Sequence, residues 1–482
     1  MSGPAKEYPA RFMSERLTVL VMAAGRGTRM RSSLPKVLHP VCGKPMVEWV
    51  IEAARAAGAD DVVCIVRPGD GVVEGLPGSV TIAEQRVGEG TGAAVLSARE
   101  AVGDEGEVVV LSGDVPLQSP ELIADLVSAH RSQRAAATLL TTEGLDPSGY
   151  GRIVRAADGS VQQIVETKHM DGVPAEQLAI REINIGTYAF AAAELWTALD
   201  EVGTEHGEVY LTGALPVLKR RGLPVNSHLT DDVRSAMGVN DRAALMEVES
   251  IAQHQILIAH ARNGVTFRAP ASVVVEAGVT IGEDTTVGAA TTLRGATTIG
   301  NGCTIGPATT ITDSQLADGI SAPHSFLVEA RVERGASLGP FAYLRPGAHV
   351  GPGAKIGTFV EVKNAEIGAG AKVPHLSYIG DADIGESANI GAGNITANYD
   401  GRHKHRTTIG TGVRTGVDTA FVAPVDIGDG AYTGAGSVIT EDVPEGALGM
   451  ARSKQTNIEG FADRDNRGNR GNRGNRKDEE RD

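Results

Sequence analysis

The chain has 482 residues, of which 41% are hydrophobic and 22% charged, a composition typical of globular proteins with two or three domains. Acidic side chains outnumber basic ones by 60 to 45, and the net charge of −15 argues against a protein that coats nucleic acid or an anionic membrane. Only three cysteines occur, far apart, which excludes a disulfide framework and a clustered zinc site and favours a reducing cytoplasm.

The chain begins with a polar stretch at residues 1–16. This stretch lacks the apolar core of a signal peptide, and no apolar run in the sequence is long enough to span a bilayer. We therefore expect a flexible N-terminal arm on a cytoplasmic protein with no membrane insertion.

Residues 17–240 alternate between short apolar runs and helical stretches. The runs LTVLV, DVVCIV and EVVVLSGD are typical of buried strands. The stretch SPELIADLVSAHRSQ is typical of a helix with Ser119 as N-cap and Pro120 in the first helical position. This alternation predicts a Rossmann-like α/β domain, whose parallel sheet is covered by helices on both faces.

Residues 241–264 contain no proline and end in Asn-Gly, which predicts one long linker helix before a second domain at 265–460. There, an aliphatic residue recurs at every sixth position from Ile281 to Ile311 and, after an irregular stretch, from Val332 onward, with slips at Ile367 and Ile384. This period fits a short strand plus a corner, with the aliphatic side chains pointing into a prism. The pattern resembles the left-handed parallel β-helix of hexapeptide-repeat proteins.

The sequence ends in the NRG triplets and charged residues of 461–482. A segment so polar should be disordered. Arginine–glycine triplets could contact RNA, but the acidic residues beside them and the lack of aromatics favour a solvated tail.

The first strand runs into the loop MAAGRGTRM, whose small residues let backbone N–H groups approach a phosphate. We expect a helix N-terminus behind the loop to favour anions, and Arg29 and Lys36 add positive charge suited to a polyphosphate. The loop is not a P-loop, because no Gly-Lys-Ser/Thr follows, nor a dinucleotide loop, because Met30 replaces the third glycine.

Asp114 ends the run EVVVLSGD. Ligands of open α/β sheets bind at the carboxyl ends of the strands, so a carboxylate there is suited to hold Mg²⁺. Alone, Asp114 could be an ordinary turn residue before Pro116. The neighbouring phosphate-binding features favour the metal interpretation.

These motifs resemble the nucleotidyltransferases that activate sugar 1-phosphates. In particular, residues 17–460 resemble the bacterial family of bifunctional N-acetylglucosamine-1-phosphate uridyltransferase/glucosamine-1-phosphate acetyltransferase enzymes. The resemblance implies catalytic roles for Arg29 and Lys36. It implies Mg²⁺ ligation by Asp114 and Asn240. It also implies contacts with UTP or UDP-N-acetylglucosamine from Ala23, Ala24, Gly25, Lys36, Gln85, Gly90, Thr91, Gly113, Gly151, Glu166, Asn184 and Asn240. Ser112 replaces a tyrosine of some members, which removes one ring contact with the nucleotide.

A second constellation surrounds His375 in the repeat region. A lone histidine is more often a surface residue than a catalyst, but cations and tyrosines recur on nearby repeats. Cations suit a phosphate on a sugar, and a neutral histidine suits a general base.

The same family resemblance implies that His375 is the base that takes a proton from the amine of glucosamine 1-phosphate, which then attacks acetyl-CoA. Glucosamine 1-phosphate would contact Arg345, Lys363, Tyr378 and Asn389. Acetyl-CoA would contact Ala392, Asn398, Tyr399, Val417, Ala435 and Arg452, with the backbone N–H of Ala392 facing the oxyanion. Val417 replaces a serine common in the family, which puts one hydrogen bond to CoA in doubt.

The leading interpretation is therefore a bifunctional enzyme that makes UDP-N-acetylglucosamine from UTP, acetyl-CoA and glucosamine 1-phosphate, with Mg²⁺ as cofactor. The family resemblance also implies a homotrimer. One alternative is a glucose-1-phosphate nucleotidylyltransferase whose β-helix only assembles or regulates, but that leaves His375, Lys363 and Arg345 without a purpose. Another is a non-enzymatic scaffold like the translation-initiation exchange-factor subunits, which need not keep Arg29, Lys36 and Asp114.

Overall fold

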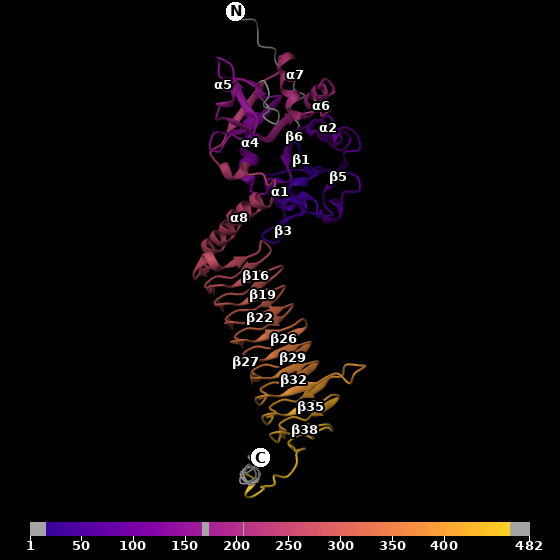
Figure 1. The fold of residues 1–482 in the computed structure, drawn as a ribbon, viewed down its shortest axis with the longest axis vertical. Helices are drawn as coiled ribbons and strands as arrows, with labels where there is room; N and C mark the ends of the chain where they lie inside the picture. Colours follow the sequence, from indigo (N-terminus) through magenta and orange to yellow (C-terminus); the bar gives the residue numbers. More distant parts are fainter. Residues whose placement is uncertain (1–15, 166–172, 206, 463–482) are drawn as a thin grey trace, which may run out of the picture. The chain divides into compact units, whose positions relative to one another are not determined.

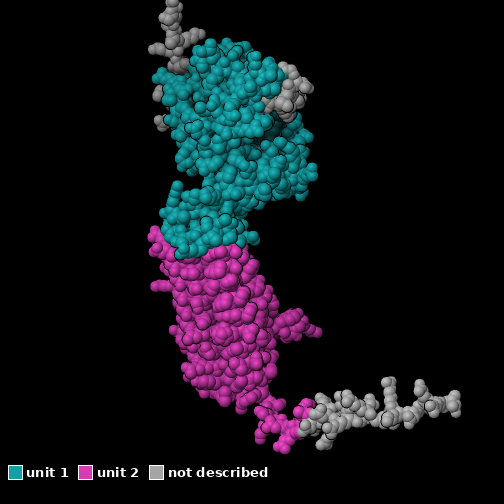
Figure 2. All heavy atoms as spheres, turned by 60° about the vertical axis from the view of Figure 1, so that its left-hand side comes forward, with its two compact units in different colours: residues 1–281, 292–297 teal, residues 282–291, 298–482 magenta. Residues whose placement is uncertain are grey.

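The structure, a computed structural model, describes residues 16–165, 173–205 and 207–462. Most of the predicted N-terminal arm and tail lies outside these residues. The chain forms two compact units, coloured separately in Figure 2: residues up to 281 together with 292–297, and residues 282–291 together with those from 298 onward.

The first unit is built on a nine-stranded sheet of order β11-β7-β10-β6-β1-β4-β5, with β8 attached to β10 and β9 to β8. Strands β4, β1 and β6 are parallel, but β10 runs antiparallel to β6 and β7. The prediction of a parallel sheet is wrong here, because the connection from β7 to β10 passes through the antiparallel hairpin β8–β9 instead of a crossover helix. The strands are β1 Leu17–Met22, β4 Asp61–Val66, β5 Thr81–Glu84, β6 Glu107–Ser112, β7 Ala137–Thr142, β8 Arg152–Arg155, β9 Val161–Val165, β10 Ile183–Ala191 and β11 Val225–Leu229.

Helices cover both faces of this sheet, as predicted (Figure 1). Along β1, Leu20 belongs to one buried cluster, whereas Val19 and Val21 belong to the other, so alternate side chains face opposite layers. The predicted cap of α4 is confirmed, since the Ser119 hydroxyl accepts a hydrogen bond from the backbone N–H of Leu122 at 3.2 Å. The helices are α1 Met46–Ala56 and α4 Pro120–Ser132 on one face and α2 Thr91–Leu96, α6 Ala192–Asp200 and α7 Ala214–Arg220 on the other.

Helix α8, Arg242–Arg262, follows this sheet. It starts where the carboxylate of Asp241 accepts hydrogen bonds from two backbone N–H groups in the first turn, those of Ala243 and Ala244. Further along, the Gln253 amide exchanges two 3.1 Å hydrogen bonds with the backbone of Val275, so side-chain contacts tie α8 to the first repeats. None of the helices in the described ranges combines the length and the apolar character that a membrane span requires.

From residue 266 the chain coils into three stacks of short parallel strands, which confirms the β-helix. We define the first face as the stack from β12 to β30, continued through bridges at Asn389, Arg414 and Tyr432. The second face runs from β13 to β38 and the third from β14 to β36.

The first-face strands are β12 Thr266–Phe267, β15 Thr286–Val287, β18 Thr304–Ile305, β21 Ser321–Ala322, β24 Ser337–Leu338, β27 Lys355–Thr358 and β30 Lys372–His375. Later arguments also use β25 Tyr343–Leu344, β28 Glu361–Lys363, β31 Tyr378–Gly380, β33 Ile395–Ala397, β37 Tyr432–Thr433 and β39 Leu448–Gly449.

The aliphatic ladder fills the prism as predicted, from Val287 to Ile390, although Ile281 at its start is only half-buried. The stretch that looks irregular in the sequence is an ordinary coil. There Leu316, Ala322 and Leu327 take the inward positions and are 0–3% exposed. Alanine in one inward position and three five-residue steps, from Ile311 to Leu316, Ala322 to Leu327 and Leu327 to Val332, hide this coil from a search for aliphatic residues at every sixth position.

All three cysteines are free and buried. Burial is the main cause that raises the pKa of Cys42 and of Cys64 to about 12, and it raises the pKa of Cys303 as well. Because the thiolate is the reactive form, we expect the folded protein to leave a thiol reagent such as DTNB unreacted at mildly alkaline pH, and the unfolded chain to react at all three positions. Rapid colour formation by the native protein would contradict this.

Candidate active sites

The first candidate site lies at the carboxyl ends of the central strands, around the loop that follows β1. Gly27 in this loop has a φ of 57°, and a Cβ there would lie 2.5 Å from the Cβ of Lys36, so the turn requires glycine. The loop leads into a single 3₁₀ turn, Thr28–Met30, and not into a helix. The expected helix dipole is therefore missing. An anion at this loop would be held by the backbone N–H groups and the cations.

Four of the predicted residues meet beside this loop. Asn240 Oδ1 accepts hydrogen bonds from Arg29 at 2.8 Å and from the Lys36 ammonium at 3.1 Å. The ammonium also donates to Asp114 Oδ2. Lys36 and Asp114 are mostly buried, with 11% and 25% of their side chains exposed. Residues from three distant segments thus form one charged centre.

The backbone positions the two oxygen-bearing residues of this centre. Strand β6 ends at Ser112, two residues earlier than predicted, so Asp114 lies in the turn that follows. The N–H of Gly113 donates to Met22 O at 2.9 Å, and the N–H of Val239 donates to Asp114 O at 2.9 Å. These bonds hold the Asp114 turn between β1 and the segment that carries Asn240.

Three of the residues predicted to contact the nucleotide, Gln85, Gly90 and Thr91, lie between the end of β5 and the start of α2. Gln85 is 5% exposed, and its amide nitrogen donates to the carbonyl of Gly88 at 3.2 Å and, more weakly, to that of Gly90 at 3.5 Å. Gly90 has a φ of 97°, and a Cβ there would lie 2.5 Å from Val209 O. The Thr91 hydroxyl accepts a hydrogen bond from the N–H of Leu211 at 3.0 Å. These contacts fix the shape of the loop from 85 to 91.

Of three further residues predicted to contact UTP or UDP-N-acetylglucosamine, Gly151, Glu166 and Asn184, the structure describes the first and the last. The Asn184 N–H donates to Gly151 O at 2.9 Å, and the Asn184 side chain donates to the Tyr188 hydroxyl at 2.6 Å. Glu166 lies outside the described residues. Burial is the main cause that raises the pKa of Tyr150, and the Asp114 carboxylate of the charged centre adds to it.

Sequence reasoning missed a cluster that supports the loop. Arg67 Nε donates to Ala24 O at 2.8 Å, and its guanidinium pairs with Glu89 at 2.6 Å. Arg26 also pairs with Glu89, at 3.0 Å. Hydrogen bonding from Arg67 lowers the pKa of Glu89. No local pattern marks these residues, because they belong to three separate segments.

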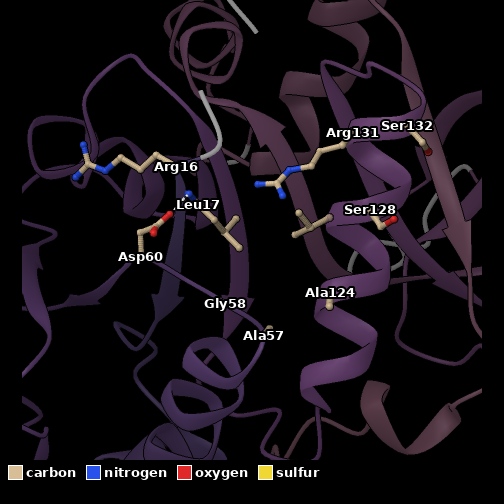
Figure 3. Close-up of a pocket in the computed structure, with 10 residues that line it drawn as sticks. Arg16, Leu17, Ala57, Gly58, Asp60, Ala124, Ser128, Arg131 and Ser132 are labelled. Atoms are coloured by element: carbon tan, nitrogen blue, oxygen red, sulfur yellow. Dashed lines mark hydrogen bonds between the residues drawn. The ribbon is translucent and has the colours of Figure 1, made fainter. Parts of the chain in front are cut away.

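A cavity of about 930 Å³ lies elsewhere on the same unit, between the start of β1 and helix α4 (Figure 3). It is lined by Arg16, Leu17, Ala57, Gly58, Asp60, Ala124, Val127, Ser128, Arg131 and Ser132, none of which is a predicted site residue. The cavity opens at the amino end of β1, whereas ligands of open α/β sheets bind at the carboxyl ends. We therefore assign the candidate site to the charged centre.

The second candidate site lies on the β-helix around His375, the last residue of β30. The His375 carbonyl accepts hydrogen bonds from the Ser377 hydroxyl at 2.7 Å and from the Gly393 N–H at 3.3 Å. Its side chain is exposed, and no partner of the imidazole lies within the described ranges. The backbone is thus held while the ring can reach a ligand.

Four predicted residues stack at this corner of the prism, one in each coil. The N–H of Asp418 donates to Ala392 O, and that of Gly436 to Val417 O, both at 2.8 Å. Together with the bond between Gly393 and His375, these bonds place the corner residues in a line, with about 4.8 Å between successive coils. We call His375, Ala392, Val417 and Ala435 the corner column.

A polar cluster lies on the second face, beside the corner column. The Asp381 carboxylate accepts hydrogen bonds from Lys363 at 3.4 Å and from Asn398, whose amide nitrogen lies 3.5 Å from the Tyr378 hydroxyl. Arg345 pairs with Glu361 at 2.8 Å. Burial alone would raise the pKa of Asp381. The hydrogen bonds from Asn364, Asn398 and Lys363, together with the charge of Lys363, have the larger effect and lower the pKa.

Lys404, which sequence reasoning missed, belongs to this cluster. The nearby Lys363 side chain, with its positive charge, lowers the pKa of Lys404. Two ammonium groups held together suit a doubly charged anion. Lys363 and Lys404 are far apart in the sequence. The loop between β33 and β34, Thr407–Ile409, brings them together.

Two of the remaining predicted residues, Asn389 and Arg452, lie apart from this cluster, whereas Tyr399 adjoins it through a backbone bridge to Lys404. Asn389 is on the first face, bridged to Lys372 and Arg414, so one subunit presents it on a different face from Arg345 and Lys363. Tyr399, 61% exposed, projects from the loop after β33, and Arg452 lies on the exposed C-terminal segment.

Comparisons with known proteins match both units. Residues 19–217 match the family described as MobA-like NTP transferase domain, and residues 278–313 match the one described as bacterial transferase hexapeptide (six repeats). The bifunctional protein GlmU of Brevibacillus brevis is 46% identical over 453 residues, which cover 93% of this chain and 98% of the relative. The bifunctional protein GlmU of Mycobacterium tuberculosis is 44% identical over 458 residues, 92% of each chain.

Proposed function

The chain belongs to the GlmU family of bifunctional proteins, and on this premise we propose how its two sites make UDP-N-acetylglucosamine. It is both an acetyltransferase and a uridyltransferase. The β-helix acetylates glucosamine 1-phosphate with acetyl-CoA. The α/β unit then transfers uridylate from UTP to N-acetylglucosamine 1-phosphate.

In the α/β unit, a phosphate oxygen of the sugar attacks the α-phosphorus of UTP, and the bond from that phosphorus to the leaving pyrophosphate breaks. No covalent group of the protein is needed, because the reaction depends on positioning and on neutralising charge. Arg29 and Lys36 are proposed to hold the polyphosphate. Their hydrogen bonds to Asn240 support a shared role.

The donor set of this site fits Mg²⁺. Oxygens of Asp114 and Asn240 converge on one cation, the Lys36 ammonium, so they can also converge on a metal ion. The described ranges hold no group of three or more His, Cys, Asp or Glu residues that could form a metal cage. Two protein oxygens completed by phosphates and water are a common magnesium site, and the bound ion would neutralise charge on the phosphates. We propose Asp114 and Asn240 as its ligands.

In the β-helix, His375 is proposed to take the proton from the sugar ammonium or amine. The amine nitrogen forms a bond to the acetyl carbon, the carbon–sulfur bond breaks, and CoA leaves as a thiolate that takes up a proton. The exposed imidazole at the head of the corner column is the observation that carries this proposal. The pantetheine arm would follow that column past Ala392, Val417 and Ala435, with the Ala392 N–H directed at the oxyanion.

We propose that the functional form is a homotrimer. The proposed amino-sugar ligands are divided between two faces of one prism, with Asn389 on the first and Arg345, Lys363 and Tyr378 on the second. A site formed between the first face of one subunit and the second face of the next would bring them together.

The decisive experiment measures thiol release from acetyl-CoA by the purified chain, with and without glucosamine 1-phosphate. We expect release only when the amino sugar is present. Absence of release from a folded trimeric sample would contradict the acetyltransferase assignment. Pyrophosphate release from UTP and N-acetylglucosamine 1-phosphate tests the other half separately.

Replacing Val417 by serine should restore a hydrogen bond to CoA. Val417 is 49% exposed in the corner column, so a hydroxyl fits without disturbing the prism. One hydrogen bond contributes about 0.5–1.5 kcal/mol. We therefore expect Val417→Ser to lower the KM for acetyl-CoA by roughly 2- to 10-fold, with an unchanged KM for glucosamine 1-phosphate. An unchanged KM for acetyl-CoA would remove this position from the CoA site.

A further inference from the structure

The first face carries a column of cations, none of which belongs to the polar cluster or to the corner column. Lys355 and Lys372 are directly opposite each other in β27 and β30, and bridges continue the column through Asn389 to Arg414. All three cations are exposed. Within the described ranges none of them has a carboxylate partner.

This arrangement contrasts with the other two faces. On the second face Arg345 pairs with Glu361, and on the third face Arg406 pairs with Asp383. Like charges directly opposite in adjacent strands are destabilising, and the chain as a whole is strongly acidic. An unpaired basic column in such a chain is therefore suited to an anionic ligand.

An apolar surface follows the cations in the same column. Tyr432 is bridged to Arg414 and is 46% exposed, and Leu448 lies opposite it in β39 and is 61% exposed. A phosphate-binding arginine next to an exposed aromatic ring is suited to a nucleotide, because purine bases stack on such rings.

The column lies within reach of the proposed acetyl site. Lys372 is three residues before His375 in β30, about 10 Å along the strand. Arg414 and Tyr432 are each three residues before a member of the corner column, Val417 and Ala435. Arg414 is thus about 14 Å from His375, two coils along the prism and three residues across it. A long extended acyl donor can connect these points.

We propose that Lys372, Arg414 and Tyr432 bind the nucleotide end of acetyl-CoA. Lys372 and Arg414 hold its phosphates and the Tyr432 ring stacks on its adenine, while the thioester lies at His375. We call these three residues the nucleotide strip. This proposal rests on the proposed acetyl transfer, and it adds residues that position the donor without touching the reacting atoms.

The test compares Arg414→Ala and Tyr432→Ala in the full chain with the control Arg334→Ala, which removes an exposed cation away from the first face. We expect the KM for acetyl-CoA to rise about tenfold or more in Arg414→Ala, since a charge-assisted hydrogen bond is lost. Tyr432→Ala should raise it by several-fold. The kcat and the KM for glucosamine 1-phosphate should stay unchanged. With acetyl-pantetheine, which lacks the nucleotide, wild type and variants should be alike.

Other results would overturn the nucleotide strip. A raised KM for glucosamine 1-phosphate alone would mean that the cations bind the sugar phosphate. A trimer that dissociates in Arg414→Ala would mean that the column contacts a second copy of the chain. Equal KM values for acetyl-CoA in all variants would mean that the column binds no part of the donor.

A separate readout distinguishes this proposal from the proposed function. Calorimetric titration with adenosine 3′,5′-bisphosphate measures nucleotide binding without catalysis, and we expect binding by wild type and Arg334→Ala but at least tenfold weaker binding by Arg414→Ala. If the wild type bound this probe but released no thiol, the acetyl transfer would fail and the strip would stand. If the wild type acetylated the sugar but bound the probe no better than Arg414→Ala, the strip would fail alone.

Discussion

Asp114→Ala is expected to abolish uridylyl transfer while acetyl transfer continues at the wild-type rate. The substitution removes one of the two oxygens proposed to hold Mg²⁺ and leaves Lys36 with Asn240 as its remaining partner. Losing one preorganised electrostatic contact typically lowers turnover by about 10²–10³-fold, and loss of the metal adds to this. Pyrophosphate release and thiol release, measured on the same preparation, report the two reactions.

Two controls separate this effect from damage to the fold. Asp125→Ala removes an exposed carboxylate from α4 and should leave both rates unchanged. Asp114→Asn keeps the shape of the side chain but not its charge, and should also lose uridylyl transfer. If Asp114→Ala lost both activities in a folded protein, the two reactions would share a site or depend on one another, contrary to the division between the two units.

His375→Ala is expected to lower the rate of acetyl transfer by about 10²–10⁴-fold, the range for loss of a general base. Because His375 is exposed at the end of β30 and Val373 fills the prism beside it, the coil should stay folded. The KM values for both substrates should change little, since the imidazole is proposed to move a proton and not to hold either substrate. Thiol release at saturating substrates is the measurement.

The matched control is His254→Ala, which removes an exposed histidine from α8 and should change neither reaction. Uridylyl transfer should continue normally in both histidine variants. A wild-type rate of acetyl transfer in His375→Ala would exclude this residue from the mechanism and direct attention to Lys404, whose pKa is lowered by Lys363.

The β-helix could be predicted from the sequence because its signal is local and repeated. Each inward position is filled by one aliphatic residue and each corner repeats within a few residues, so the register from Val332 to Val362 is visible without any long-range information. The coil with Ala322 lacks this signal, because alanine takes one inward position and the steps that end at Leu316, Leu327 and Val332 are five residues long.

The mixed sheet and parts of both sites could not be predicted in this way. Whether β10 runs parallel or antiparallel to its neighbours depends on the path of the chain through β8 and β9. The pattern of apolar and polar residues in a strand is the same for either direction, so it does not reveal this path. Arg67 and Lys404 act through contacts with segments far along the chain, and nothing near them in the sequence marks those contacts. Motif reasoning found Arg29, Lys36, Asp114 and Asn240, but their convergence depends on the fold.

Side chains do not determine the distance between successive members of the corner column. Its members are joined by backbone hydrogen bonds between coils, so the step of about 4.8 Å is the same whatever residue occupies each position. In the proposed binding mode, the distance between contacts along the pantetheine arm is therefore a whole number of coils. A point substitution would change the affinity for acetyl-CoA but not the distance between these contacts. Inserting a complete coil between Ala392 and Val417, which lie in successive coils, would lengthen that distance by one coil, about 4.8 Å.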